Sequence, residues 1–357
     1  MKIVQMMPSL LYGDAVGNDA VAILNALLGH GYESCIYVDV PVSALDIRLP
    51  LEHVRHIDEY RDSRDNVILL HLATGSRINT LVKKFKAKLV VIYHNITPAR
   101  FWEPYSPQTA AVIREGLDEA IGLAKRAEHA IADSEFNKKD LIAMGYTCDI
   151  DVVPILLDID SYGTRPTEKI VKSLKKGGFT NLLYTGRMAP NKKVEDCITA
   201  FYYYKKYIND KSRLILVVSR STEDVYFRKL VKYAQLLDIE DVVFTGHVPF
   251  EDMLAYYKSA DVYLSMSEHE GFCVPLVEAM YFSVPIVAYA SCAVPETLGG
   301  CGILLEKKDP MTVAEAINVA AADRKIRTEM IEAEKKRLEE LSPARVEKSL
   351  MDIIKRL

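Results

Sequence analysis

Two glutamates, Glu270 and Glu278, lie in the stretch of the sequence that is richest in possible chemistry, separated by seven residues. The apolar run from Val262 to Met266 is too short for a helix and predicts a buried parallel strand ahead of them. An acidic turn follows, and residues 274–282 are expected to form a helix that carries Glu278. Ligands of such sheets bind beyond the carboxyl ends of the strands, where helix N-termini can hold an anion. The spacing therefore predicts two carboxylates beside a phosphate-binding helix start.

Taken singly, a turn glutamate and a helix glutamate are most often solvated surface residues. The apolar runs that flank Glu270 and Glu278 on both sides argue against a fully solvated surface position for these two residues. A carboxylate suits paired sugar hydroxyls, because it accepts a hydrogen bond from each of them.

A second polar loop follows the predicted strand Leu182–Thr185. Gly186 would let a phosphate approach the backbone, while Arg187 and Lys192 supply positive charge. Alone, this loop is equally consistent with a surface turn that bears two solvated cations. Together with the acidic loop downstream, it predicts a site where cations stabilise a departing diphosphate.

These motifs resemble those of the retaining glycosyltransferases of family 4, which have the GT-B fold. The resemblance is densest from Leu182 to Leu305 and is carried by Gly186-Arg187-x4-Lys192, Glu270-Gly271-Phe272, Pro275, Glu278-Ala279-Met280 and Pro285. It implies that Glu270, Arg187 and Lys192 take part in catalysis. It also implies that a nucleoside diphosphate sugar is bound by Gly17, Gly186, Arg187, Lys192, Phe272, Cys273, Val274, Pro275, Leu276 and Glu278.

In the first half of the chain, a loop with Gly17 follows the first predicted strand and takes the place of the family's glycine-containing loop near the donor. His94 follows another buried strand. A lone histidine there is more often structural, but the resemblance implies that His94 contacts the sugar and acts in catalysis. His71 is a weaker candidate for the same region, and His53 with His56 lacks further metal ligands.

The sequence departs from the family pattern at four places. Cys273, Ser283 and Lys193 each replace a usual glycine, and Ser219-Arg220-Ser221 replaces a glycine-containing loop. These departures concern the geometry of the donor pocket more than the fold.

Short apolar strands alternate with amphipathic helices along almost the whole chain, which predicts parallel sheets with helices on both faces. A length of 357 residues suggests two domains. We therefore expect an α/β fold of two doubly wound Rossmann-like domains that face a central cleft, and the family resemblance implies that this is the GT-B fold. The resemblance also implies that residues 1–160 form the acceptor-binding domain and residues 161–343 the donor-binding domain, with helix 344–357 able to pack back on the first.

Charge and cysteine content exclude several classes of protein. A net charge of −4 gives no reason to expect nucleic acid as a partner, and the six cysteines contain no C-x-x-C. No signal peptide and no apolar run of about 18 residues is evident, so we expect a cytoplasmic protein. The basic run Lys83–Lys88 is usually a solvated face, and its functional interpretation is peripheral contact with the inner membrane face. We expect no cofactor and no metal.

The resemblance thus implies a retaining, metal-independent glycosyltransferase. It would move a hexosyl group from GDP-mannose or a UDP-sugar to a saccharide or lipid-linked acceptor in surface polysaccharide or glycoconjugate biosynthesis. The segment Tyr93–Pro98 resembles a mannosyl-transferring subgroup. Two alternatives remain open. A nucleotide-sugar 2-epimerase of the same architecture would isomerise the donor without an acceptor, and a non-catalytic nucleotide-sugar-binding subunit would bind the donor without turnover.

Overall fold

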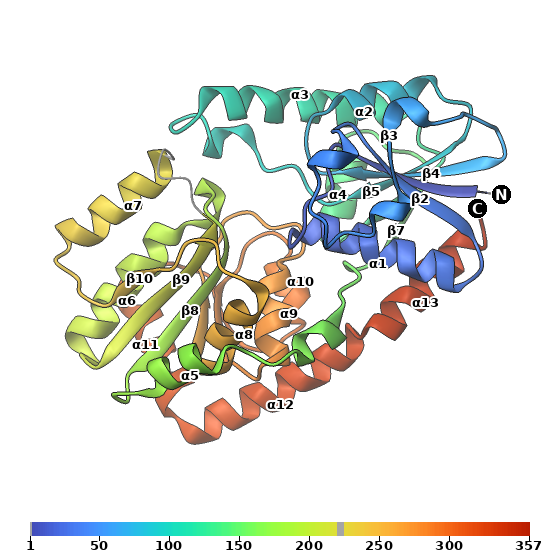
Figure 1. The fold of residues 1–357 in the computed structure, drawn as a ribbon. Coiled ribbons are helices and arrows are strands. Elements are labelled where there is room, and N and C mark those ends of the chain that lie inside the picture. Colours follow the sequence, from blue (N-terminus) through green and yellow to red (C-terminus); the bar gives the residue numbers. More distant parts are fainter. Residues whose placement is uncertain (1, 220–224) are drawn as a thin grey trace. The chain divides into compact units, whose positions relative to one another are not determined.

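The computed structural model describes residues 2–219 and 225–357, and the chain divides into two compact units (Figure 1). Unit 1 comprises Met1–Asp158 and Leu341–Leu357, and unit 2 comprises Ile159–Glu340. The sequence places this boundary after residue 160, and the structure places it after Asp158.

Unit 1 is built on a seven-stranded sheet in the order β3-β2-β1-β4-β5-β6-β7, and its paired strands are all parallel. Alternate residues of β1 enter different cores, since Ile3 packs in one apolar cluster and Val4 in another. Both faces of the sheet are therefore covered. The strands are β1 Lys2–Met7, β2 Glu33–Val38, β3 Val54–His56, β4 Asn66–Leu72, β5 Lys88–Tyr93, β6 His129–Ala132 and β7 Asp149–Val152.

Helices pack on the two faces of this sheet. One core includes side chains of α2, α3 and α4, and the opposite core includes side chains of α1 and α13. Figure 1 shows α13 beside α1, although these helices lie at opposite ends of the chain. The helices of unit 1 are α1 Ala15–Gly29, α2 Arg77–Leu81, α3 Pro107–Leu123, α4 Glu135–Ala143 and α13 Pro343–Ile354, with short 3-10 turns η1 Val42–Ala44, η2 Leu51–His53, η3 Ile57–Glu59, η4 Val82–Lys84 and η5 Ala99–Phe101.

Unit 2 repeats the architecture with a six-stranded parallel sheet in the order β10-β9-β8-β11-β12-β13. The strands are β8 Thr180–Arg187, β9 Ser212–Ser219, β10 Val242–Phe244, β11 Val262–Ser265, β12 Ile286–Tyr289 and β13 Ile303–Leu305. The helices and 3-10 turns are η6 Ile159–Gly163, α5 Glu168–Lys175, η7 Pro190–Lys192, α6 Val194–Tyr207, α7 Val225–Leu236, α8 Phe250–Ser259, α9 Val274–Tyr281, α10 Val294–Leu298, α11 Pro310–Ala322 and α12 Arg324–Glu340. The two parallel α/β units confirm the predicted pair of Rossmann-like domains.

The strand order of each unit changes direction next to its first strand. In unit 2 this point lies between β8 and β11, and in unit 1 it lies between β1 and β4. Open α/β sheets bind ligands at such points, beyond the carboxyl ends of the strands. The loops that follow β8 and β11 are the two polar loops on which the predicted donor site rests.

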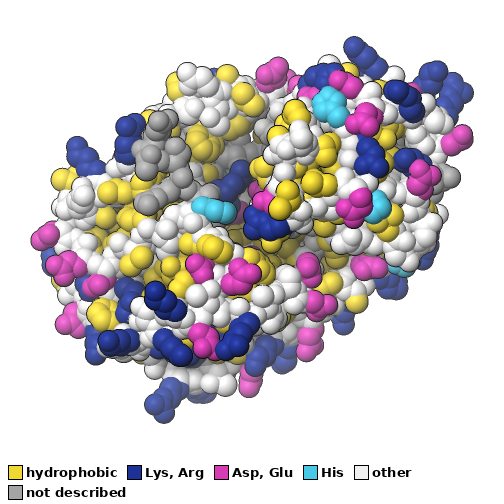
Figure 2. Space-filling model, in the orientation of Figure 1, with side chains coloured by type: hydrophobic (Ala, Val, Ile, Leu, Met, Phe, Trp, Pro, Cys, Tyr) yellow, Lys and Arg dark blue, Asp and Glu magenta, His cyan; other side chains and the backbone are white. Residues whose placement is uncertain are grey.

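The surface carries both signs of charge. Figure 2 shows acidic and basic side chains interspersed over the face in view, in keeping with the net charge of −4. Among the described residues, no helix combines the length and the apolar composition that crossing a membrane requires.

Candidate functional site

The predicted phosphate loop begins where β8 ends. Gly186 has a φ of +148°, a conformation that favours glycine. A Cβ on Gly186 would also lie 3.1 Å from the hydroxyl oxygen of Tyr184. Backbone conformation and the buried phenol beneath it together explain the glycine. The next residue, Arg187, is exposed, and its side chain makes no hydrogen bond or ion pair with the described part of the chain.

Lys192 and Glu270 form the central contact of the site. The Nζ atom of Lys192 lies 2.7 Å and 2.6 Å from the two carboxylate oxygens of Glu270. The Lys192 side chain is 16% exposed and the Glu270 side chain 7%, so the pair is largely shielded from water. Asn191 ties the same two loops together, because its side chain donates to the His269 carbonyl and its own carbonyl accepts from the Glu268 amide. The structure thus brings together two residues predicted from separate motifs.

The start of α9 offers backbone donors. Cys273 precedes the helix with a φ of +75°, and in the described residues the amides of Phe272, Cys273 and Val274 donate no hydrogen bond. Such free amides at a helix N-terminus suit an anion. The side chains of Phe272, Cys273 and Leu276 are buried, so Phe272 and Cys273 can meet a ligand chiefly through their backbone, whereas the Leu276 amide already donates to the Cys273 carbonyl. Burial, and then the Glu270 carboxylate, raise the pKa of the Cys273 thiol well above its ordinary value.

Glu278 lies on α9 and is held by two phenols. The Tyr257 hydroxyl lies 2.6 Å from Oε2 of Glu278, and the Tyr162 hydroxyl lies 3.3 Å from Oε1. Burial raises the pKa of the Glu278 carboxyl, and these two hydrogen bonds partly offset that rise. Pro275, near the start of the same helix, supplies no amide donor there.

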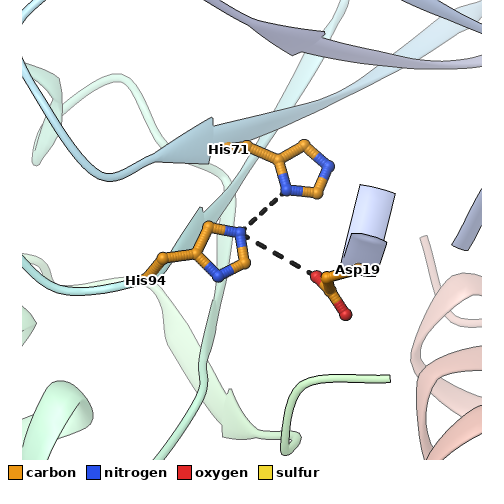
Figure 3. A group of neighbouring side chains, drawn as sticks. All are labelled: Asp19, His71 and His94. Atoms are coloured by element: carbon orange, nitrogen blue, oxygen red, sulfur yellow. Dashed lines mark hydrogen bonds and ion pairs between the residues drawn. The ribbon is translucent and has the colours of Figure 1, made fainter. Parts of the chain in front are cut away.

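In unit 1, His94 lies at the centre of a buried polar chain. Its Nδ1 is 2.9 Å from Oδ2 of Asp133, and its Nε2 is 2.8 Å from Nδ1 of His71. The other nitrogen of His71 is 2.7 Å from Oε1 of Gln5. Figure 3 shows His71 and Asp19 on the same side of His94, the side that bears Nε2, with Oδ2 of Asp19 3.9 Å from that nitrogen. Both ring nitrogens of His94 are therefore occupied by protein partners.

The hydrogen-bond partners assign the protons of this chain. Gln5 donates its amide to the carbonyl of Ala20, so its oxygen faces His71 and must accept. His71 then donates from Nε2 and accepts at Nδ1. His94 therefore donates from Nε2 to His71, and with Asp133 ionised it also donates from Nδ1 and carries a positive charge.

The electrostatics agree with this assignment. Burial, and then the charge of His94, lower the pKa of His71 well below its ordinary value. Burial alone would lower the pKa of His94, but the carboxylates of Asp133 and Asp19 outweigh it and raise the pKa to about 9. Burial raises the pKa of Asp19 to about 7. The chain thus holds a neutral His71 beside a protonated His94.

Asp19, His71 and His94 also place one possible metal-ligand atom each within 4.8 Å of one another. The two histidine nitrogens, however, are only 2.8 Å apart and share a proton. Nitrogen ligands about 2.0 Å from a tetrahedral zinc ion stand farther apart than that, and the ion would have to displace the proton. The arrangement fits a shared proton better than a metal ion.

Gly17 lies in the first turn of α1, where a Cβ would come within 2.3 Å of the carbonyl oxygen of Leu11. Close packing of the loop on the helix explains this glycine.

The three glycine replacements share one conformation. Cys273, Ser283 and Lys193 have φ values of +75°, +55° and +50°, in the left-handed region where glycine is favoured. The departures from the family pattern therefore fall where the backbone still takes the conformation suited to glycine. In the segment Ser219-Arg220-Ser221, the last two residues lie outside the described part of the chain.

Sequence reasoning did not identify the partners of the predicted residues. Gln5, Asp19 and Asp133 around His94, and Tyr257 and Tyr162 around Glu278, were not singled out. One signal was available: Gln5 is a polar residue inside an otherwise apolar strand.

Comparison with solved structures identifies the fold. The chain superposes over its full length on sucrose-phosphate synthase from Thermosynechococcus elongatus, with a TM-score of 0.78 and 16% identity over 99% of that chain. It also superposes over its full length on Anabaena Alr3699/HepE in complex with UDP and glucose, with a TM-score of 0.74 and 20% identity over 100% of that chain. These similarities establish the GT-B fold.

Comparison with protein families identifies the second half of the chain more closely. Residues 166–337 match the model described as "Glycosyl transferases group 1". The family 4 resemblance predicted from the sequence is consistent with this result.

Among curated relatives, O-antigen chain mannosyltransferase B of Escherichia coli is 25% identical over 228 residues, which cover 62% of this chain and 58% of that protein. O-antigen chain mannosyltransferase RfbU of Salmonella typhimurium is 26% identical over 197 residues, which cover 55% of this chain and 50% of that protein. The matches thus span only about half of each relative's length.

Proposed function

We propose that the protein is a retaining glycosyltransferase that moves a hexosyl group from a nucleoside diphosphate sugar to a saccharide or lipid-linked acceptor. The observation that carries the proposal is the contact between Lys192 and Glu270, next to the amides at the start of α9, which donate to no acceptor in the described part of the chain. A cation, a helix N-terminus and a carboxylate at the carboxyl ends of parallel strands suit a sugar diphosphate.

Each residue of unit 2 has a distinct part in this proposal. Lys192 and Arg187 neutralise the diphosphate as charge builds on it during departure, together with the amides of α9. Glu270, released from part of its contact with Lys192, faces the sugar as positive charge develops there. Glu278 accepts hydrogen bonds from the ribose hydroxyls.

The transfer step is proposed to be a front-face displacement. The bond between the anomeric carbon and the phosphate oxygen breaks, and the acceptor oxygen forms a bond to the same face of that carbon. The acceptor proton passes to the leaving phosphate oxygen, so no protein nucleophile is required and the configuration is retained.

The role that we propose for His94 differs from the role predicted from the sequence. The sequence predicts contact between His94 and the sugar, but such a contact would require one ring nitrogen to leave Asp133 or His71. A doubly donating imidazolium has no free lone pair and cannot act as a general base. We propose that His94 contributes a fixed positive charge to unit 1.

The donor and acceptor classes rest on the relatives. Two of them are named O-antigen chain mannosyltransferases, and a Mycobacterium tuberculosis relative is named a GDP-mannose-dependent mannosyltransferase; these names support GDP-mannose as the donor and a surface polysaccharide precursor as the acceptor. A UDP-sugar remains the other donor class to test.

Two measurements test the proposal. A thermal-shift screen of UDP-, GDP- and ADP-sugars should reveal one donor class that raises the melting temperature, because a ligand that binds only the folded chain stabilises it. Transfer from that donor should then give a product with the anomeric configuration of the donor by NMR. An inverted product would contradict the mechanism, and isomerisation of the donor without an acceptor would favour a 2-epimerase.

Metal independence is part of the proposal, since Arg187, Lys192 and the helix amides supply the phosphate contacts. Transfer should survive excess EDTA. Complete loss of activity that added Mg²⁺ or Mn²⁺ restores would overturn it.

A further inference from the structure

One buried phenol connects the two halves of the donor site in unit 2. Tyr257 on α8 is fully buried, and its hydroxyl oxygen lies 2.6 Å from Oε2 of Glu278 and 2.6 Å from Oγ1 of Thr185. Thr185 directly precedes Gly186 and Arg187 at the end of β8. A single hydroxyl thus joins the phosphate loop to the carboxylate on α9.

The available protons decide which groups donate and which accept in these two hydrogen bonds. A phenol has one proton to donate, and an ionised carboxylate is the stronger acceptor of the neighbours. Tyr257 therefore donates to Glu278 and accepts from the hydroxyl of Thr185. The distance of 2.6 Å to Glu278 lies in the range of charge-assisted O–H···O⁻ bonds.

The other contacts around these groups are weaker. The Tyr162 hydroxyl is 3.3 Å from Glu278, and the carbonyl of Pro275 is 3.4 Å from the Tyr257 hydroxyl. Both distances lie beyond the usual range for O–H···O bonds. Tyr257 consequently provides the main restraint on the orientation of the Glu278 carboxylate.

We propose that Tyr257 is the positioning residue that fixes the Glu278 carboxylate to receive the paired ribose hydroxyls of the nucleotide. Tyr257 does not touch the donor in this account. Its hydroxyl occupies one side of Oε2, so that the remaining lone pairs of Glu278 are presented in one orientation. The inference rests on the proposed function, in which Glu278 binds the ribose.

The same hydrogen bonds also restrain the phosphate loop. Because Thr185 donates to the same phenol, rotation of the Glu278 side chain and displacement of the end of β8 are resisted by one hydrogen-bonded chain. Ribose recognition and phosphate recognition are therefore held in a fixed relation within unit 2.

The test compares Tyr257→Phe with Tyr263→Phe. Tyr263 is an equally buried phenol whose ring stacks on Tyr257 at 6.1 Å between centroids, but its hydroxyl donates to the backbone carbonyl of Thr185 and not to Glu278. Tyr257→Phe should raise the donor KM about tenfold with kcat within about twofold of the wild type. Tyr263→Phe should leave the donor KM unchanged.

A double-mutant cycle with Glu278→Ala separates positioning from general damage. In the Glu278→Ala background, Tyr257→Phe should add no further rise in donor KM, because the group that it positions is gone. Additive effects on donor KM would overturn the inference, and so would an unchanged donor KM in Tyr257→Phe.

Two further results keep the test decisive. If Tyr257→Phe fails to fold, Thr185→Val should still raise the donor KM by a smaller factor, and no rise would overturn the inference. A wild type that binds no nucleotide sugar would instead refute the proposed function. A wild type that binds it and is weakened by Glu278→Ala, but not by Tyr257→Phe, would refute this inference alone.

Discussion

Glu334 gives the sharpest prediction about stability. This glutamate on α12 is fully buried, its Oε1 accepts from the amide of Ile286 at 3.1 Å, and its Oε2 has no partner among the described residues. Burial raises the pKa of the carboxyl from 4.5 to about 8, although the Ile286 amide and Arg327 oppose the rise. The folded chain therefore binds a proton here that the unfolded chain releases above pH 4.5.

Proton linkage gives the sign and the size of the change in stability with pH. Stability from this group is fully present below about pH 4.5 and is lost as the pH rises through the folded pKa of about 8. At roughly 1.4 kcal/mol per pKa unit, the loss is about 3 kcal/mol by pH 7 and on the order of 4 kcal/mol by pH 8. Glu334→Gln removes the ionisation and keeps an oxygen that can accept from Ile286. It should therefore abolish most of this pH dependence.

The assay is urea unfolding followed by far-UV circular dichroism at pH 5, 7 and 8. The matched control is Glu332→Gln, an exposed glutamate on the same helix. The free energy of unfolding of Glu334→Gln should exceed that of the wild type increasingly from pH 5 to pH 8, whereas Glu332→Gln should follow the wild type. Parallel pH profiles for Glu334→Gln and the wild type would refute the reasoning.

Three further predictions concern the site of unit 2. Arg187→Ala and Lys192→Ala should each lower turnover on the order of 10²-fold with the circular dichroism spectrum unchanged, and near-normal transfer by both would remove the phosphate role. In steady-state kinetics, Glu278→Gln should chiefly raise the donor KM, whereas Glu270→Gln should chiefly lower kcat. The reason is that only the Glu270 contact strengthens as charge develops on the sugar. The reverse pattern would exchange the two roles. Ser283→Gly should raise the free energy of unfolding by about 0.5–1 kcal/mol in urea titrations, since Ser283 has a φ of +55°, and a loss of stability would argue against backbone strain there.

Much of the fold was predictable because the hydrophobic patterns of strands and of helices are both strong in this sequence. Buried parallel strands read as short apolar runs, and the helices between them are amphipathic. Local capping follows the sequence in the same way: serine is a favoured N-cap residue, and the Ser134 hydroxyl accepts from the amide of Asn137 at 3.1 Å. The unpredicted strands β3 Val54–His56 and β13 Ile303–Leu305 have three residues each and lie at sheet edges, where one-sided pairing leaves little apolar signal.

The site was predictable only in part, for a physical reason. Lys192 and Glu270 could be found because each belongs to a local motif at a strand end. Their direct contact, and the hold of Tyr257 on Glu278, join residues far apart in the sequence through side chains that look like ordinary core residues. A phenol in an apolar helix face gives no local sign of its hydrogen-bond partner.

The histidine chain shows the same limit. His94 was chosen for its place after a strand, and His71 was ranked below it. The structure links the two and makes the charge of His94 depend on the amide orientation of Gln5. No sequence pattern encodes that orientation, because it is set by the carbonyl of Ala20 in the packed core.

The central claim is that unit 2 binds the diphosphate of a sugar nucleotide at Lys192. Isothermal titration of GDP-mannose and of UDP-glucose into the wild type, Lys192→Ala and Lys258→Ala tests it directly, because Lys258 is an exposed lysine on α8 of the same unit. We expect the wild type and Lys258→Ala to bind one of the two donors with equal affinity and Lys192→Ala to bind it at least about tenfold more weakly. Failure of the wild type to bind either donor, or equal binding by all three proteins, would contradict the account.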